Sequence, residues 1–175
     1  MMCRNTVRWL YRIDRSYSWE SGLEVSQDLV FRDAEGKVRL VVEVGGRLTV
    51  MAGYAWNGCS PKVCVLDILV GTPDGAVHER TGKPKTYFAS MVHDALYQFL
   101  DAESPITRVQ ADGCFFRLMA ESDFVLRHLY WLAVRAFGRL VWQGKKTVRK
   151  WRGEVVPIPL LAVHSAGRQY QQGAV

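Results

Sequence analysis

A histidine beside a carboxylate, His93-Asp94, stands in a segment that is otherwise rich in apolar and aromatic residues. A second carboxylate, Asp112, follows later in the chain, again among apolar neighbours. Buried imidazole and carboxylate groups need polar partners or a metal, because their removal from water is costly. A carboxylate that holds a histidine fixes its tautomer and stabilises the imidazolium, as a general base requires. The pattern therefore predicts a His93–Asp112 pair in which His93 activates water.

The same residues allow two other interpretations. Cys59 or Cys114 could be a thiolate nucleophile, with His93 and Asp112 completing a triad. A buried cysteine, however, is more often a small core residue. Alternatively, His93, Asp94 and Asp112 form a structural polar network that joins two helices. The solvent exposure of these side chains distinguishes the interpretations, since a catalytic pair needs a cleft that solvent can reach, whereas a structural network is closed to solvent.

Helices are predicted for the second half of the chain. His93, Asp94 and Tyr97 fall on one stripe of the first helix. Thr107 and Gln110 have the spacing of a capping box at the start of the second. The polar residues of the third fall on one narrow line, so we expect that helix to be mostly buried and central. The three predicted helices cover residues 86–101, 107–120 and 123–142.

The first third of the chain has the alternation of β-strands. Apolar residues recur at every second position through 22–31, 38–44 and 48–52, with turn signals between them. An antiparallel meander follows from this pattern. Residues 63–70 fit a short helix or a strand equally, and 72–84 are expected to form an exposed, mobile loop.

These elements predict an α+β fold, with an N-terminal antiparallel β-meander packed on a C-terminal three-helix unit. The length of 175 residues suits a single domain with one core, which we assign to residues 1–155. Residues 156–175 contain Pro157 and Pro159 and are expected to form an irregular, flexible tail.

Composition narrows the possible environments. A hydrophobic fraction of 49% with 23% charged residues argues against general disorder. The segment 1–15 lacks the continuous apolar core of a signal peptide, and four polar residues interrupt the apolar stretch 124–142, which argues against a membrane span. We therefore expect reduced cysteines and a cytoplasmic protein. The net charge of +6 favours anionic partners.

Much of the positive charge lies in one basic segment near the C-terminus. Basic residues beside a tryptophan can contact the phosphates of lipids or nucleic acids. The alternative without a binding function is a solvated helix end whose positive charge complements the helix dipole. The candidate anion- or lipid-contact residues are Lys145, Lys146, Arg149, Lys150, Trp151 and Arg152.

Three short strings resemble a family of bacteriophage and prophage proteins known as a domain of unknown function. They comprise a loop with Gly58, Ser60 and Pro61, the helical string His93-Asp94-Ala95-Leu96-Tyr97, and Ala111-Asp112-Gly113-Cys114-Phe115. The family usually has an aspartate before the loop glycine, where this chain has Asn57. The resemblance implies a phage or prophage protein that acts in the bacterial host cytoplasm or with the virion. It also implies phage or host proteins as partners, in a tail component or an inhibitor of host defences.

A more distant resemblance, to phospholipase A2, implies a mechanism. In that family a helix carries His-Asp-x-x-Tyr, and an aspartate on an antiparallel helix orients the histidine. The resemblance makes His93, Asp112 and Tyr97 the catalytic residues and phospholipid the substrate. It assigns a cation, Ca²⁺, to Asp94 and to the loop at Asn57 and Gly58, whose oxygen atoms suit a hard ion.

Overall fold

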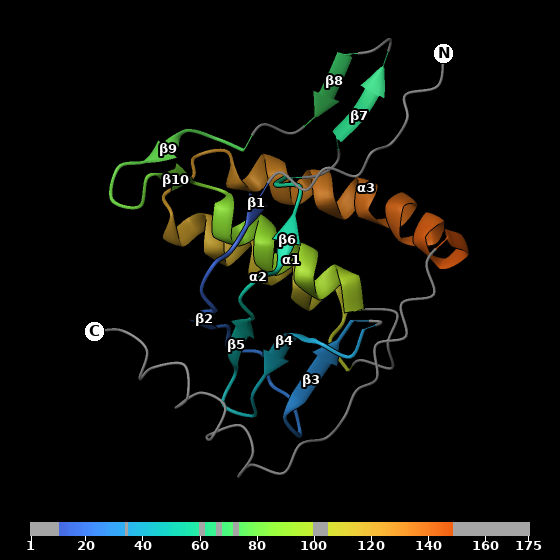
Figure 1. The fold of residues 1–175 in the computed structure, drawn as a ribbon. Helices are drawn as coiled ribbons and strands as arrows, with labels where there is room; N and C mark the ends of the chain where they lie inside the picture. The colour runs from blue at the N-terminus through green and yellow to red at the C-terminus, as the bar shows by residue number, and fades with distance from the viewer. Residues whose placement is uncertain are drawn as a thin grey trace.

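The computed structural model describes residues 11–33, 35–59, 62–65, 68–71, 74–99 and 105–148 (Figure 1). Antiparallel strands come first and three helices follow, so the α+β prediction is confirmed. Helices α1 and α2 lie between a four-stranded sheet and helix α3 (Figure 1). The helices are α1 (Tyr87–Phe99), α2 (Arg108–Glu121) and α3 (Arg127–Val148).

The four-stranded sheet has the order β2-β5-β4-β3, and all its neighbouring strands are antiparallel. Leu40 and Val42 on β4 are fully buried, as are Leu48 and Val50 on β5. Side chains that alternate across a strand place such residues on one face, and here that face meets the helices through α1. The strands are β2 (Tyr17–Glu20), β3 (Leu29–Arg32), β4 (Val38–Val42) and β5 (Arg47–Val50).

The first predicted strand was wrong in its boundaries. The sheet instead uses β2, which precedes the predicted start at residue 22, and it uses only the end of 22–31 as β3. Gly22 has a φ of +58°, which breaks the extended backbone. The Asp28 carboxylate accepts the Val44 N–H at 2.8 Å, so the chain around Asp28 serves to cap a neighbouring strand end.

Three two-stranded antiparallel sheets complete the β-structure. The segment 63–70, whose type the sequence left open, falls on the paired strands β7 and β8. The predicted loop 72–84 contains a small hairpin, β9–β10, and β1 pairs with β6, which follows β5 in the chain. Their bounds are β1 (Tyr11–Arg12), β6 (Ala55–Trp56), β7 (Lys62–Val65), β8 (Ile68–Gly71), β9 (Val77–His78) and β10 (Lys83–Pro84).

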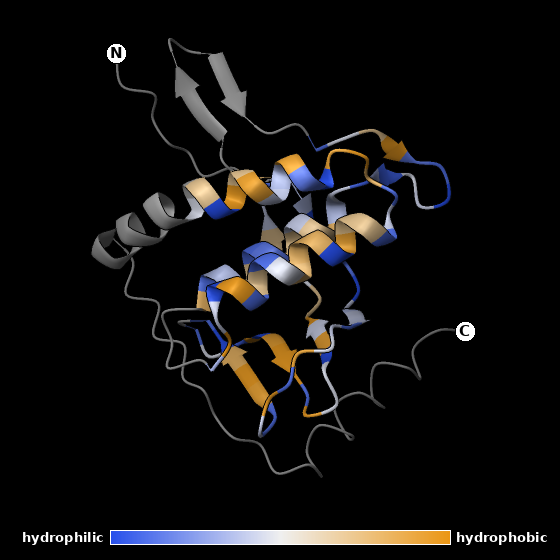
Figure 2. Ribbon diagram, turned by 180° about the vertical axis from the view of Figure 1, so that it is seen from behind, coloured by the Kyte–Doolittle hydropathy of each residue, from blue (hydrophilic) through white to orange (hydrophobic). Residues whose placement is uncertain are grey.

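The central helix is α1, and the expectation that the third helix is central was wrong. Helix α1 contacts α2 and the strands β4 and β6, whereas α3 packs on α2 at the edge of the fold. Leu129 and Leu132 of α3 are exposed. Figure 2 shows hydrophobic residues along much of the described part of this helix. The prediction took the line of polar residues on this helix as its solvent-facing side. Arg135 on that line instead points inward to the buried Asp112 carboxylate.

The capping box predicted at the second helix is confirmed. Thr107 Oγ1 accepts the Gln110 N–H at 3.3 Å, and Gln110 Oε1 accepts the Thr107 N–H at 2.8 Å. Among the described residues, no helix is long and apolar enough to cross a membrane. Lys145 and Lys146 belong to the backbone of α3, while the rest of the basic segment (149–152) and the predicted tail lie outside the described residues.

Candidate functional site

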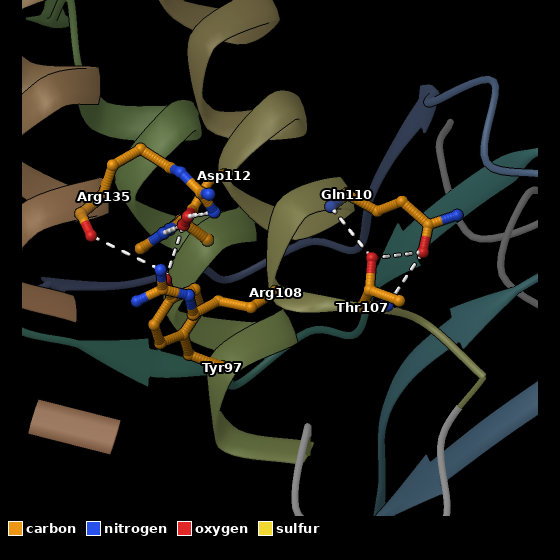
Figure 3. A network of polar contacts seen from close by, with 7 residues as sticks. Tyr97, Thr107, Arg108, Gln110, Asp112 and Arg135 are labelled. Atoms are coloured by element: carbon orange, nitrogen blue, oxygen red, sulfur yellow. Dashed lines mark hydrogen bonds and ion pairs between the residues drawn. The ribbon is translucent and has the colours of Figure 1, made fainter. Parts of the chain in front are cut away.

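One buried carboxylate, Asp112 on α2, is contacted by polar side chains from the other two helices, α1 and α3 (Figure 3). Its Oδ1 atom lies 3.0 Å from His93 Nε2 and accepts the Tyr97 hydroxyl at 2.5 Å, both from α1. Its Oδ2 atom accepts Arg135 Nη1 from α3 at 3.2 Å. The predicted hydrogen bond between His93 and Asp112 is therefore confirmed, and Tyr97 joins the same atom.

Asp112 is held as a carboxylate despite its burial. The side chain is fully buried, which raises its pKa, but hydrogen bonds from His93 and Tyr97 and the nearby Arg135 outweigh that effect. The pKa of Asp112 consequently lies below its usual value. For Tyr97, burial and the bond to Asp112 both raise the pKa, so the phenol stays protonated and donates.

These charges define the state of His93. An ionised carboxylate only accepts hydrogen bonds, so His93 carries a proton on Nε2 and, in its neutral form, has a free lone pair on Nδ1. Arg135 supplies a positive charge 3.2 Å from the other oxygen of the same carboxylate. The ring is also fixed by Tyr97 and Phe115, whose ring centroids lie 4.1 and 4.8 Å away.

The cluster is closed to solvent over most of its surface. Asp112 is completely buried, Tyr97 and His93 are buried, and the His93 side chain keeps 11% of its surface exposed. Arg135 is the most open member, with 32% of its side chain exposed. Solvent therefore reaches the network at His93 and at Arg135, which lie on opposite oxygens of the carboxylate.

Arg135 is a site residue that sequence reasoning did not identify. The feature of the sequence that could have indicated it is a guanidinium within the apolar stretch 124–142. A buried carboxylate on the preceding helix needs such a partner. Arg108, one turn before Asp112, extends the cluster, since its Nη2 atom donates to the Arg135 carbonyl at 3.4 Å. Gly138 allows α3 to approach, because a Cβ there would lie 3.0 Å from the Tyr97 oxygen.

The loop at Asn57 and Gly58 is organised by a second carboxylate that the sequence did not single out. Asp74 Oδ1 accepts the Cys59 N–H at 2.8 Å, and Asp74 Oδ2 accepts the Tyr11 hydroxyl at 3.0 Å. Gly58 has a φ of +73° and lies directly against the Asp74 carboxylate. The backbone N–H of Cys59, next to Gly58, thus binds the anionic side chain of Asp74.

The structure places this loop and Asp94 at different levels of α1. Trp56 on β6 donates to Ser90 at 3.1 Å, and the Asp74 carbonyl accepts the Thr86 hydroxyl at 2.5 Å. Asp94 instead lies near Tyr54, whose pKa is raised by burial and then by the Asp94 charge. Thr86 directly precedes α1, and Ser90 and Asp94 lie about one turn apart on it.

The expected cation is Ca²⁺, which takes oxygen ligands at about 2.3 to 2.6 Å. Within the part of the chain whose side chains are described, no three His, Cys, Asp or Glu residues gather as a metal site. Asp94 and the loop at Asn57 and Gly58 remain its predicted ligands. The described contacts of the cluster itself involve His93, Asp112, Tyr97 and Arg135.

The two described cysteines are buried. Burial raises the pKa of the Cys114 thiol, and the neighbouring Arg117 offsets only part of that effect. A neutral, enclosed thiol is a poor nucleophile. Cys114 therefore behaves as a core residue, and a thiolate mechanism through it gains no support.

Gly58→Ala is expected to lower the free energy of unfolding by about 2 to 3 kcal/mol, because the new methyl group overlaps the Asp74 carboxylate and the backbone is left-handed. Urea denaturation followed by circular dichroism measures the change. Gly36→Ala is the matched control: Gly36 has a φ of +79° and no atom within 4 Å of the added carbon. It should cost about 1 kcal/mol. Equal losses in the two variants would contradict a close Gly58–Asp74 contact.

Comparison of the chain with protein-family models, with curated proteins and with solved structures finds no match.

Proposed function

We propose that the protein is an ester hydrolase in which His93 is the general base and Asp112 orients it. The observation that carries this proposal is the bond from His93 Nε2 to a buried, ionised carboxylate whose charge is balanced by Arg135. That arrangement fixes the tautomer and leaves Nδ1 to accept a proton. The exposed part of the His93 side chain is where water would approach.

The proposed reaction uses water and an ester. Nδ1 of His93 takes a proton from water, and the oxygen of that water attacks the ester carbonyl carbon. When the tetrahedral intermediate collapses, the C–O bond to the alcohol breaks and the proton passes from Nδ1 to the departing oxygen. Asp112 stabilises the imidazolium that exists between these steps, and the Tyr97 hydroxyl keeps the carboxylate in place.

Phospholipid is the proposed substrate class, on the strength of the resemblance of the His-Asp-x-x-Tyr helix to phospholipase A2. The resemblance also supplies the proposal that Ca²⁺ takes part, with Asp94, Asn57 and Gly58 as ligands. No step of the mechanism above is routed through that ion.

The test is the release of fatty acid from a short-chain phosphatidylglycerol by the purified protein, with Ca²⁺ and with EGTA. Release in both conditions supports a metal-independent base, and release with Ca²⁺ alone supports the cation. A preparation of His93→Gln, purified in the same way, measures contaminating activity. Equal release by the two proteins would refute the hydrolase.

A second candidate function is favoured by one observation, the nearly complete burial of the cluster. In this alternative His93 and Tyr97 bind α1, and Arg135 binds α3, to Asp112 on α2. Asp94 adds charge at the surface of α1. The protein would then be a non-enzymatic phage component or an inhibitor of host defences that works through its surface. Substitution of His93 would lower the melting temperature, and no phospholipid would be hydrolysed.

A further inference from the structure

The outward face of α3 and the turn before it carry aliphatic side chains with no covering element in the described structure. Val125, Leu126, Leu129 and Leu132 are 83%, 50%, 61% and 57% exposed. They fall within two turns, over about 10 Å of helix axis. Scattered exposed leucines are ordinary, but a contiguous group of this kind marks an interaction surface.

The charge of the same segment indicates what kind of surface it meets. From Phe124 to Gly153 the sequence has no aspartate or glutamate. Over the same span it has the basic residues Arg127, Arg135, Arg139, Lys145, Lys146, Arg149, Lys150 and Arg152. Arg135 forms an ion pair with Asp112. All of these basic residues are counted in the net charge of +6. A segment that combines exposed aliphatic side chains with basic and no acidic residues is complementary to an anionic partner.

A second copy of the chain is a poor occupant for this face. A two-fold dimer through α3 would bring the same patch of each protomer together, so the basic helices would face each other. Like charges across an interface are unfavourable. An anionic bilayer, in contrast, accepts aliphatic side chains among its acyl chains and basic side chains among its phosphates.

We propose that Val125, Leu126, Leu129 and Leu132 dock the protein on the surface of an anionic phospholipid bilayer, with α3 lying in the plane of the interface. The helix has an amphipathic pattern and low overall hydropathy, which suits binding at the surface of a bilayer. The inference rests on the proposed function only for its biological purpose, the supply of phospholipid to His93. The binding itself does not require catalysis.

The test is co-sedimentation of the purified protein with vesicles of phosphatidylcholine, alone or mixed equally with phosphatidylglycerol. We expect the protein to bind the mixed vesicles and to dissociate as salt increases. The double variant Leu129→Glu/Leu132→Glu should bind at least about tenfold more weakly, since two aliphatic contacts are lost and negative charge is added. These side chains are exposed, so circular dichroism should show an unchanged fold.

Val77→Glu is the matched control, because Val77 is 61% exposed on the β9–β10 hairpin. It should bind like the wild type. Failure of the wild type to bind the mixed vesicles, or equal binding by the double variant, would overturn the proposal. A concentration-dependent dimer that the double variant abolishes would assign the face to a second copy instead. His93→Gln should bind the mixed vesicles normally. Wild-type protein that binds them but hydrolyses no phospholipid would refute the proposed function and leave this surface standing.

Discussion

His93→Gln should reduce ester hydrolysis by about 10²- to 10⁴-fold, the range that a positioned general base contributes. Glutamine is chosen because its terminal amide can reach the place of Nε2 and donate to Asp112 Oδ1, which now lies 3.0 Å from the imidazole. The variant loses the Nδ1 lone pair but keeps the donor to the buried carboxylate. The loss should therefore appear in kcat, with the melting temperature changed little.

His128→Gln is the control for this variant. His128 lies on the exposed side of α3, where its ring contacts Phe116 at 4.9 Å between centroids. The substitution should leave hydrolysis unchanged. If His93→Gln retained full activity, His93 would not be the base; if it lost activity only in proportion to a loss of folded protein, the helix clamp would be the better description.

Asp112→Ala should be the most destabilising single change in the helical unit, by about 3 kcal/mol in the free energy of unfolding. The substitution leaves the Tyr97 hydroxyl and His93 Nε2–H buried without their acceptor, and it removes the counter-charge of Arg135. The partial exposure of Arg135 keeps the loss at the lower end of that expected for a broken buried pair. Urea denaturation at neutral pH measures it.

The same variant should also change the response to acid. Because the pKa of Asp112 is lower in the folded protein than its ordinary 3.8, its stabilising effect is complete well above that pH. The effect fades as the pH falls below 3.8 and through the folded pKa. The difference in stability between wild type and Asp112→Ala should therefore shrink in acid. A difference between wild type and Asp112→Ala that stays constant over this pH range would contradict a depressed pKa.

The sequence was most informative where local chemistry determines the structure. The capping box at Thr107 depends on residues three positions apart, and the His93–Asp112 bond follows from two buried polar groups on helices joined by a short connection. In both cases the costs of unpaired groups leave few alternatives. The antiparallel strands β4 and β5 likewise follow from alternation and the Gly45-Gly46 turn.

Long-range partners could not be read in the same way. Helical periodicity shows that α3 has two faces, but it does not say which one meets α2, so the sequence did not show that Arg135 reaches Asp112. Asp74 lies in a segment with no periodicity, and only the fold brings it to Cys59.

The position of one carboxylate between three helices has a consequence for how the protein opens. When α3 detaches, Arg135 leaves and the Asp112 charge remains enclosed with two donors; when α1 detaches, it loses both His93 and Tyr97. Either partial opening leaves a buried ion without some of its partners. Each opening therefore costs more free energy than the loss of contacts between apolar side chains alone would suggest. The three helices should therefore exchange their amide hydrogens as one cooperative unit, and the sheet edge β2, held by a single neighbour, should exchange sooner.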